Sequence, residues 1–592
     1  MCGICGIYNF NKDAPISKDT LNSMNDAILH RGPDDSGVYI SEYIGLGHRR
    51  LSIIDLQHGK QPMSNEDHTI WVTYNGEIYN YQDLKKDLSK KGHIFKTNCD
   101  TEIIVHAYEE YNADCILRFN GMFAFGIWDN TNNTLFLARD RLGIKPLYYT
   151  ISDGNFIFSS EIKSILQHPS THAEVEISSI PEYFFCTSLL DSKTMFKNIF
   201  SLPAGYTLTF KNESKHIKKY WDLQPKNISE EQTSCENYQD HIFSLLDDSV
   251  RMRLMSDVPF GSLLSGGLDS SLISALAAKH VTGKLKTFSM EYSKNIPLSQ
   301  SNLDTEYARR MAKKFNTDHQ EFMYEEEEYF DCFQHVTWQM EKPIELTTPS
   351  LYLLHKNIKK YVTVVLSGEG ADELFGGYFF FLDKAQKDNQ LFEFPWAPYF
   401  EEVSMLLDTD IERETSFREN IKSSLRDLLN RYKTDDFLNS VLFLFIKIYL
   451  LEMLERQDKT SMAWGVETRV PFLDHRFVEY VANIPSKYKF NNGEEKYILK
   501  KSFRDFLPSE IIKRKKKPFP FPIDPRFLYK QKNLANDLIQ SGNSKISIYF
   551  NKKQTNDFFN RRNNFKGIDS LAIFRTAHSM IALELWHKAF GV

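Results

Sequence analysis

The sequence lacks the features of several specialised classes of protein. Its 592 residues contain no run of about 18 apolar residues, the length that a membrane-spanning helix needs. The start of the chain is apolar but has neither the basic segment nor the cleavage site of a secretory leader. We therefore expect a cytoplasmic protein that does not bind a membrane.

A strong net charge and a cysteine framework are also missing. The 72 basic and 78 acidic side chains give a net charge of −6, which argues against nucleic acid as a partner. Among the seven cysteines only Cys2 and Cys5 have a paired spacing, and no second pair accompanies them as a zinc site would require. We expect free thiols, and partners that bind at local sites.

The pattern of apolar residues divides the chain into two domains. Residues 1–210 show short alternating segments and turn signals typical of β-sheet. Residues 211–236 are polar with little periodicity and are predicted to be a linker. Residues 237–592 begin with strands that alternate with helices, which favours a parallel sheet covered by helices, and helical patterns dominate from about residue 395.

The first candidate site surrounds Cys2. A small second residue permits removal of the initiator methionine, and the thiol would then share its residue with an α-amino group whose pKa of about 7.7–8.0 suits a base. Residues 69–74 alternate like a strand and lead into Asn75-Gly76, which is predicted to be a turn. The Asn75 amide and the Gly76 N–H could stabilise an oxyanion there.

Charged residues near Cys2 in the sequence suit an amino-acid substrate. Arg50 offers the forked geometry that a carboxylate needs, and Glu77 and Asp100 could bind an α-ammonium. Taken singly, each of these residues is more often a turn residue or a surface charge, and a lone cysteine is more often a small buried residue. Their combination favours a site.

The second candidate site consists of two turns that follow apolar strands. Residues 263–271, LLSGGLDSS, have the glycines and hydroxyls that bind phosphate, but not the GxxxxGK(S/T) pattern of a P-loop. Residues 367–378, SGEGADELFGGY, follow another apolar run. Asp269 and Asp372 would meet at the carboxyl ends of parallel strands and could hold Mg²⁺, although helix capping is an alternative for Asp372.

The first domain resembles, over its whole length, the glutaminase domain of the class II glutamine amidotransferases, in particular that of the asparagine synthetases. The resemblance rests on MCGICG, HRGPDDSG, RRLSIID, YNGEIYN, CDTE, FNGMFAFGIWD and ARDRLGIKPLYY, in this order. It implies the four-layer αββα fold of N-terminal-nucleophile hydrolases, with Cys2 as nucleophile and Asn75 and Gly76 as oxyanion hole. It also implies that glutamine is bound by Arg50, Leu51, Ile54, Asn75, Gly76, Glu77 and Asp100.

Residues 237–520 resemble the catalytic domain of the asparagine synthetases, which implies an α/β ATP pyrophosphatase fold with a helical extension. The segments that match are SDVPFGSLLSGGLDSS, VVLSGEGADELFGGY and LERQDKTSMAWGVETRVPFLDHRF. By this resemblance Glu369 is an acid or base near the acyl-adenylate, Lys496 neutralises charge at the α-phosphate, and Asp269 and Asp372 hold Mg²⁺. ATP would be bound by Leu263, Ser265, Gly266, Gly267, Asp269, Ser270, Ser271, Met290, Ser367 and Gly368.

The resemblance implies that glutamine is hydrolysed to glutamate and ammonia, and that ATP adenylates a carboxylate, which the ammonia then converts to an amide. Aspartate, converted to asparagine, is the expected acceptor. An internal ammonia tunnel and a homodimer are also implied.

Two departures from the family pattern leave other acceptors open. Residues 341–350 and 513–522 differ from the usual segments, which leaves open a sugar uronic acid in surface-polysaccharide synthesis. A non-catalytic glutamine or nucleotide sensor is a further alternative, although all the reactive groups are present. The basic residues 513–517 are expected to form a solvated face.

Overall fold

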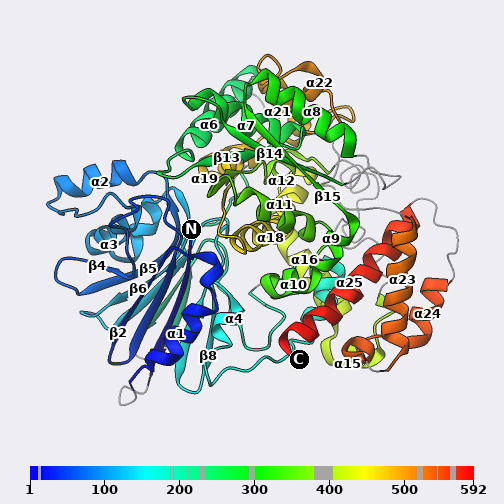
Figure 1. Ribbon diagram of the computed structural model, residues 1–592, viewed down its shortest axis with the longest axis horizontal. Coiled ribbons are helices and arrows are strands. Elements are labelled where there is room, and N and C mark those ends of the chain that lie inside the picture. Colours follow the sequence, from blue (N-terminus) through cyan, green and yellow to red (C-terminus); the bar gives the residue numbers. More distant parts are fainter. Residues whose placement is uncertain are drawn as a thin grey trace.

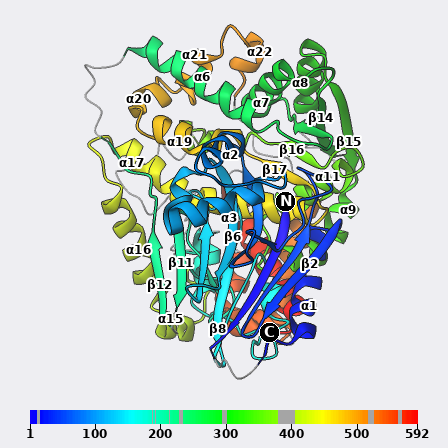
Figure 2. The same ribbon diagram turned by 90° about the vertical axis from the view of Figure 1, so that its left-hand side faces the viewer.

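A computed structural model shows two sheet-based halves, which join near the N-terminus (Figures 1 and 2). The structure describes residues 1–10, 15–186, 188–190, 192–211, 214–226, 234–292, 301–378, 404–515, 525–542, 544–560 and 568–592. Two six-stranded sheets form the first half, and a five-stranded sheet wrapped by helices forms the second.

The first half is a sandwich of two antiparallel sheets with helices on its outer faces. One sheet has the order β10-β8-β9-β1-β3-β2, with strands Phe200–Ser201, Tyr148–Ser152, Asn155–Ser159, Cys2–Asn9, Ile44–Arg50 and Asp35–Ser41. The other has the order β12-β11-β7-β6-β5-β4, with strands Ser214–Lys219, Tyr206–Lys211, Thr134–Arg139, Gly121–Asp129, Ile70–Ile78 and Met63–Ser64. Helix α1 (Lys18–Asp26) packs on β1 and β3, and α3 (Asp100–Tyr111) packs on β5. The predicted αββα fold is confirmed.

Alternation along β1 explains how this strand supports both layers. Ile4 and Tyr8 pack between the two sheets, in the same cluster as Trp128. Cys5 and Ile7 point the other way and pack in the cluster that contains Leu21 of α1. Because successive side chains of a strand face opposite sides, one short segment joins two hydrophobic layers.

Strand β5 continues through Asn75 and Gly76, so the predicted turn at these residues is wrong. A Cβ atom on Gly76 would lie only 2.1 Å from the carbonyl oxygen of Met122 on the neighbouring strand β6. Glycine is therefore required here because two backbones approach closely, and not because the chain reverses.

The second half is built on a parallel sheet of order β15-β14-β13-β16-β17, with strands Asp318–Tyr324, Lys286–Tyr292, Phe260–Leu263, Val364–Leu366 and Glu467–Arg469. The predicted alternation of strand and helix is confirmed, with α7 (Leu268–His280) after β13 and α8 (Ser301–Lys314) after β14. Strand β13 lies between β14 and β16, so the chain leaves it in one direction and later returns on its other side. Ligands bind at such switch points in open α/β sheets.

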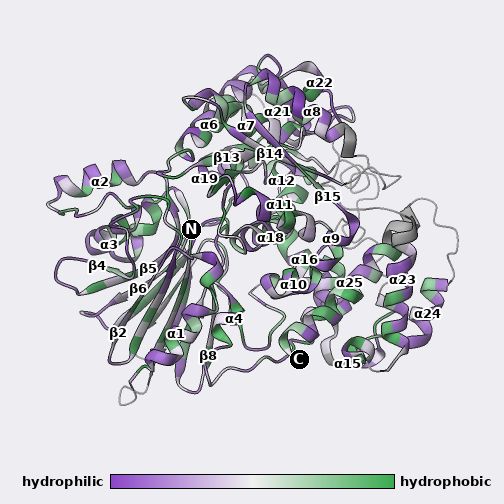
Figure 3. Ribbon diagram, in the orientation of Figure 1, coloured by the Kyte–Doolittle hydropathy of each residue, from purple (hydrophilic) through white to green (hydrophobic). Residues whose placement is uncertain are grey.

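Helices dominate the remaining described residues, as the sequence predicts. They include α6 (Cys235–Met252), α10 (Phe333–Met340), α11 (Thr348–Ile358), α12 (Ala371–Phe375), α16 (Phe417–Arg431), α17 (Phe437–Leu444), α18 (Leu450–Met462), α19 (His475–Ala482), α21 (Tyr497–Ser502), α22 (Ser509–Ile512), α23 (Pro525–Gln540), α24 (Lys552–Asn560) and α25 (Ile568–Phe590). In the first half, α2 (Tyr81–Lys90) lies at the outer edge of the molecule and carries mostly hydrophilic residues (Figure 3).

One helical stretch among the described residues, Phe437–Met462, is long and apolar enough to cross a membrane, with a mean hydropathy of 1.8. Of its most apolar window, 78% is buried inside the protein. Burial of this extent is what a core helix shows.

The segment predicted as a linker is only partly irregular. Ser214–Lys219 forms β12, which pairs with β11 at the edge of the second sheet. All six side chains of β12 are exposed, so the strand shows no alternation of apolar and polar residues that would reveal it in the sequence. Residues 212–213 and 227–233 lie outside the described part, and the domain limits stay a prediction.

Buried ion pairs join the two halves along α18. Arg31 Nη2 lies 2.8 Å from Asp458 Oδ2, and Lys145 Nζ lies 3.2 Å from Asp458 Oδ1. The Tyr148 hydroxyl donates a hydrogen bond of 2.5 Å to Glu455. Since the charged side chains of Arg31, Lys145 and Asp458 are at most 2% exposed, separating the halves would leave unpaired buried charges.

Asp140 organises the turn that carries Lys145 to this interface. Its carboxylate is buried and accepts hydrogen bonds from the backbone N–H groups of Phe123, Leu142, Ile144 and Lys145. We expect Asp140→Ala to lower the free energy of unfolding of the first half by about 3 kcal/mol or more, since each buried N–H left unpaired costs about 1–3 kcal/mol.

Urea unfolding followed by tryptophan fluorescence measures this effect. Asp140→Asn keeps one acceptor oxygen and should lose less stability, and Asp114→Ala, at an exposed position of the same half, serves as the control. Equal stability of Asp140→Ala and the control would contradict the assigned role.

Candidate active sites

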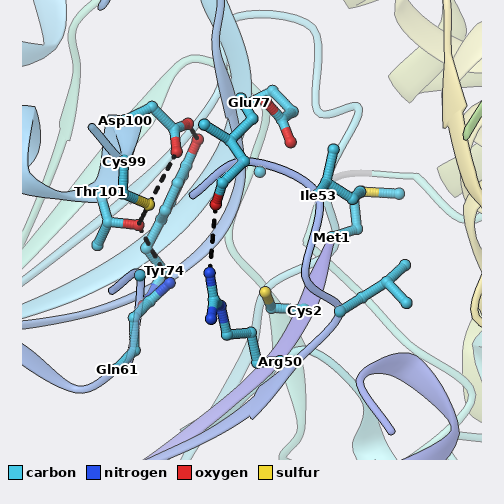
Figure 4. A pocket seen from close by; sticks show the side chains of 14 residues that line it. Met1, Cys2, Arg50, Ile53, Gln61, Tyr74, Glu77, Cys99, Asp100 and Thr101 are labelled. Atoms are coloured by element: carbon cyan, nitrogen blue, oxygen red, sulfur yellow. Dashed lines mark hydrogen bonds between the residues drawn. The ribbon is translucent and has the colours of Figure 1, made fainter. Parts of the chain in front are cut away.

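A pocket opens at the start of β1, against β3 and β5 (Figure 4). Seven of the residues predicted to bind or cleave glutamine line it: Cys2, Arg50, Leu51, Ile54, Gly76, Glu77 and Asp100. The sequence analysis did not single out the other lining residues, which are Met1, Ile53, Gly59, Gln61, Tyr74, Cys99 and Thr101. The structure thus brings the first predicted set together in one place.

Cys2 is held at the pocket by pairing on two sides. It lies opposite Arg50 in the β1–β3 register, and its N–H donates a hydrogen bond of 3.0 Å to Asn75 Oδ1. The Asn75 Nδ2 group is buried and has no hydrogen-bond partner among the described residues. A buried donor without a partner, on a side chain that binds the Cys2 backbone, is suited to receive an oxyanion.

Burial also controls the reactivity of the thiol. It raises the pKa of Cys2, while the N-terminal ammonium, the Leu51 N–H and the Arg50 guanidinium oppose this effect. Because the thiolate is the nucleophilic form, the thiol needs a neighbouring base.

The other charged groups line the pocket around Cys2. Arg50 is fixed by hydrogen bonds to the carbonyl oxygens of Ile54 at 3.2 Å and Asp55 at 2.6 Å. Asp100 Oδ2 accepts hydrogen bonds from the Tyr74 hydroxyl at 2.8 Å and the Ile78 N–H at 2.9 Å. Burial raises the pKa of Asp100. Its carboxylate is therefore costly to ionise unless a cation arrives.

Residues missed in the sequence contribute contacts that no local pattern reveals. A Cβ on Gly59 would lie 2.4 Å from Arg50 Nη2, so this glycine makes room for the guanidinium. The ammonium of Met1 pairs at 2.9 Å with Glu467 of β17, and both groups are fully buried. Glu467 belongs to the second half of the chain, which therefore contacts a residue that lines the first pocket.

The second set of predicted residues meets at the carboxyl ends of β13 and β16. A Cβ on Gly368 would lie 2.9 Å from the backbone nitrogen of Ser270, so the two loops are packed directly together. Lys496 Nζ lies 2.6 Å from Asp269 Oδ2 and 2.6 Å from Asp372 Oδ1. The structure therefore brings these three distant residues together.

The first of these loops is held by its own hydroxyl groups and glycines. Ser270 Oγ lies 2.9 Å from Ser265 Oγ and accepts a hydrogen bond of 3.1 Å from the Ser265 N–H. Gly266 has φ +73°, and a Cβ there would lie 2.5 Å from the carbonyl oxygen of Asp304. Gly267 caps helix α7, the first turn of which carries Asp269 and Ser271, and Leu263 and Met290 lie near the ends of the adjacent strands β13 and β14.

Glu369 in the second loop faces a buried arginine that the sequence analysis missed. Arg456 Nη2 of α18 lies 3.8 Å from Glu369 Oε1. Its Nη1 donates a hydrogen bond of 2.5 Å to Thr347 Oγ1 and lies 3.7 Å from Glu345. Residues 341–350, noted above as a departure from the family pattern, therefore border the second site.

The expectation of a solvated basic face fails at Arg514. Its Nη1 donates a hydrogen bond of 2.5 Å to the Gly266 carbonyl, and it pairs with Asp304. Lys513 and Lys515 are exposed as expected, whereas residues 516–517 lie outside the described residues. A run of like charges does not reveal which member turns inward to support a loop.

The two halves match two families along almost the entire chain. Residues 1–221 match the glutamine amidotransferase domain. Residues 241–588 match asparagine synthase. The chain belongs to the asparagine synthetase family.

Relatives in the asparagine synthetase family cover most of the chain. Glutamine-hydrolyzing asparagine synthetase 3 of Bacillus subtilis (strain 168) is 36% identical over 550 residues, which span 89% of this chain and 88% of that protein. Synthetase 1 of the same organism is 31% identical over 624 residues, spanning 98% and 97%. The glutamine phosphoribosylpyrophosphate amidotransferase of B. subtilis, a solved structure, has a TM-score of 0.31 at 13% identity and covers 55% of this chain and 91% of its own.

Gly368 provides a test of the contact between the two loops. We expect Gly368→Ala to weaken ATP binding, because the new Cβ would push Ser270 away and separate the loops, while glutamine hydrolysis continues. Titration calorimetry with ATP measures the affinity. Thr282→Ala, at an exposed position of the same half, is the control. Equal ATP affinity in both variants would contradict the contact.

Proposed function

We propose that this chain is a glutamine-dependent asparagine synthetase that hydrolyses glutamine in the Cys2 pocket and adenylates aspartate at the β13–β16 loops. The observation that carries the proposal is the convergence of Lys496, Asp269 and Asp372 where the two loops meet. A cation between two carboxylates at a strand-end glycine loop is suited to phosphate chemistry. Membership of the asparagine synthetase family supports the same reaction.

In the first half reaction, the Cys2 thiol attacks the side-chain amide of glutamine. The α-amino group of Cys2, free after removal of Met1, takes the thiol proton, and the amide nitrogen leaves as ammonia. Asn75 Nδ2, buried without a hydrogen-bond partner among the described residues, and the Gly76 N–H stabilise the oxyanion. Water then releases glutamate from the thioester.

The charged groups of glutamine match the charged side chains of the pocket. The α-carboxylate of glutamine pairs with Arg50, and its α-ammonium pairs with Glu77 and Asp100. Leu51 and Ile54 cover the bound side chain. Because burial raises the pKa of both acids, the arriving ammonium favours the ionised carboxylates and is bound selectively.

In the second half reaction, the acceptor carboxylate attacks the α-phosphate of ATP and pyrophosphate leaves. Ser265, Gly267, Ser270, Ser271 and Gly368 lie where they could hold the phosphates, with Leu263 and Met290 against the nucleoside. Asp269 and Asp372 would hold Mg²⁺, since both carboxylates lie close enough to pair with the same Lys496 ammonium and Asp269 Oδ1 is buried without a hydrogen bond among the described residues. The ion, when bound, supplies positive charge to the pyrophosphate.

Arg456 favours aspartate as the acceptor. Its guanidinium is buried beside Glu369 and Glu345, so the site offers one cation and two carboxylates. Aspartate has an α-carboxylate and an α-ammonium that match this pattern, whereas a uronic acid lacks the ammonium. Glu369 would then take a proton from the attacking ammonia.

Further proposals extend this account. Ammonia would pass to the acyl-adenylate inside the protein, because in water it becomes ammonium and no longer attacks. The catalytic unit would comprise residues 1–210 and 237–592 joined by the linker, and it would work as a cytoplasmic homodimer.

Pyrophosphate release with candidate acids tests the acceptor. Release that requires aspartate, together with asparagine in the products, is expected. Release with a sugar uronic acid and none with aspartate would overturn the assignment. A protein that binds glutamine and ATP but forms no product with any acid would instead be a sensor.

Cys2→Ala separates the two half reactions. We expect glutamine hydrolysis to vanish, because the nucleophile is lost, while asparagine formation from added ammonium salt survives. Glutamate and asparagine are measured by chromatography. Cys5→Ala, buried in the same strand, is the matched control and should retain both activities. Glutamine hydrolysis that persists in Cys2→Ala would refute the nucleophile.

Arg456→Ala tests the acceptor site. The KM for aspartate should rise by about tenfold or more, as expected when a charged hydrogen-bond donor is removed. Glutamine hydrolysis should continue unchanged, which shows that the fold is intact. An unaltered KM for aspartate would exclude Arg456 from the acceptor site.

A further inference from the structure

Arg469 on β17 contacts both candidate active sites. Its carbonyl oxygen accepts a hydrogen bond of 2.8 Å from the N–H of Ser367, the first residue of the ATP loop after β16. Its Nη2 lies 3.4 Å from Glu77 Oε1 in the glutamine pocket. One residue therefore touches the ATP loop with its main chain and the glutamine pocket with its side chain.

The other nitrogen atoms of the Arg469 guanidinium, Nε and Nη1, are held by polar contacts. Its Nε pairs with Glu467 at 2.5 Å, and its Nη1 donates hydrogen bonds to the carbonyl oxygens of Arg253 at 2.8 Å and Met255 at 2.5 Å. The Nη2 group alone has no hydrogen-bond partner among the described residues and faces Glu77. A planar guanidinium held in this way keeps its free edge in a fixed orientation toward Glu77.

Glu77 is placed to use this contact. It is 3% exposed and lines the glutamine pocket, and its Oε2 is buried without a hydrogen-bond partner in the described part of the chain. Burial and the nearby Glu467 raise the pKa of Glu77, whereas Arg469 lowers it. Without Arg469, Glu77 would be a poorer partner for an ammonium group.

We propose that Arg469 is a positioning residue that holds Glu77 for the α-ammonium of glutamine and links the glutamine pocket to the ATP loop, so that each ligand changes the affinity for the other. The proposal rests on the function given above for the two pockets. A ligand that shifts Ser367 shifts the carbonyl of Arg469, and the change reaches Glu77 through one side chain. Linkage of this kind is reciprocal.

Binding measurements on the Cys2→Ala protein test the linkage directly. This variant does not turn glutamine over, and ATP with Mg²⁺ is stable without an acceptor. Titration calorimetry should give glutamine dissociation constants that differ by about fivefold or more between protein with and without ATP, and the same factor for ATP with and without glutamine. Identical constants would overturn the proposal.

Substitution of Arg469 tests the residue itself. Arg469→Gln should raise the KM for glutamine by about tenfold, abolish the linkage and leave the KM values for ammonia and aspartate unaltered. Arg469→Lys keeps a charge beside Glu77 and should recover part of the glutamine affinity. Arg476→Gln is the matched control, because Arg476 pairs with Asp248 and Asp474, which do not line the glutamine pocket.

The outcomes separate this inference from the proposed function. An unchanged glutamine KM in Arg469→Gln, or an equal rise in the control, would refute the role of Arg469 while asparagine synthesis stands. Absence of amide formation from ammonia in the unaltered protein would refute the synthetase function. Should Arg469→Gln fail to fold, the linkage measured in Cys2→Ala decides the inference.

Discussion

Charges buried between the two halves fix the arrangement on which the rest of the molecule depends. Asp458 of the second half receives both Arg31 and Lys145 from the first half. A partner removed from any of these pairs would leave an uncompensated charge away from water, at a cost of about 3–5 kcal/mol. The two halves are thereby held in one relative position. The pocket in the first half and the loops in the second therefore keep a fixed distance and orientation.

In the glutamine pocket, burial likewise raises the free-energy cost of ionising the acidic groups until the substrate binds. The pKa values of Cys2, Glu77 and Asp100 are all raised, chiefly by desolvation. In the proposed binding mode, glutamine brings an ammonium group to the two acids and a carboxylate to Arg50, so that the ligand itself would stabilise the ionised groups. A neutral ligand of similar shape would leave these groups unpaired, which would favour a free amino acid.

Local patterns in the sequence predicted the elements and most of the motif residues. Strand-end glycine loops, and the convergence of Asp269 with Asp372, follow from the rule that parallel strands end at one edge of a sheet. The prediction of a turn at Asn75-Gly76 was wrong because the glycine serves the close approach of β6, a tertiary contact that local sequence does not reveal. Arg456 and Arg469 lie in the matching segment LERQDKTSMAWGVETRVPFLDHRF, but their roles were missed because their partners lie far away in the sequence.

We propose that ammonia released at Cys2 reaches the adenylate without leaving the protein. Glutamine labelled with ¹⁵N at the side-chain amide, supplied with ATP, aspartate and an excess of unlabelled ammonium at a pH where little free ammonia exists, tests it most directly. Mass spectrometry of the asparagine should find the label retained almost completely in the side-chain amide. Dilution of the label to its share of the total ammonium would show that the two sites exchange through solvent and would contradict the account.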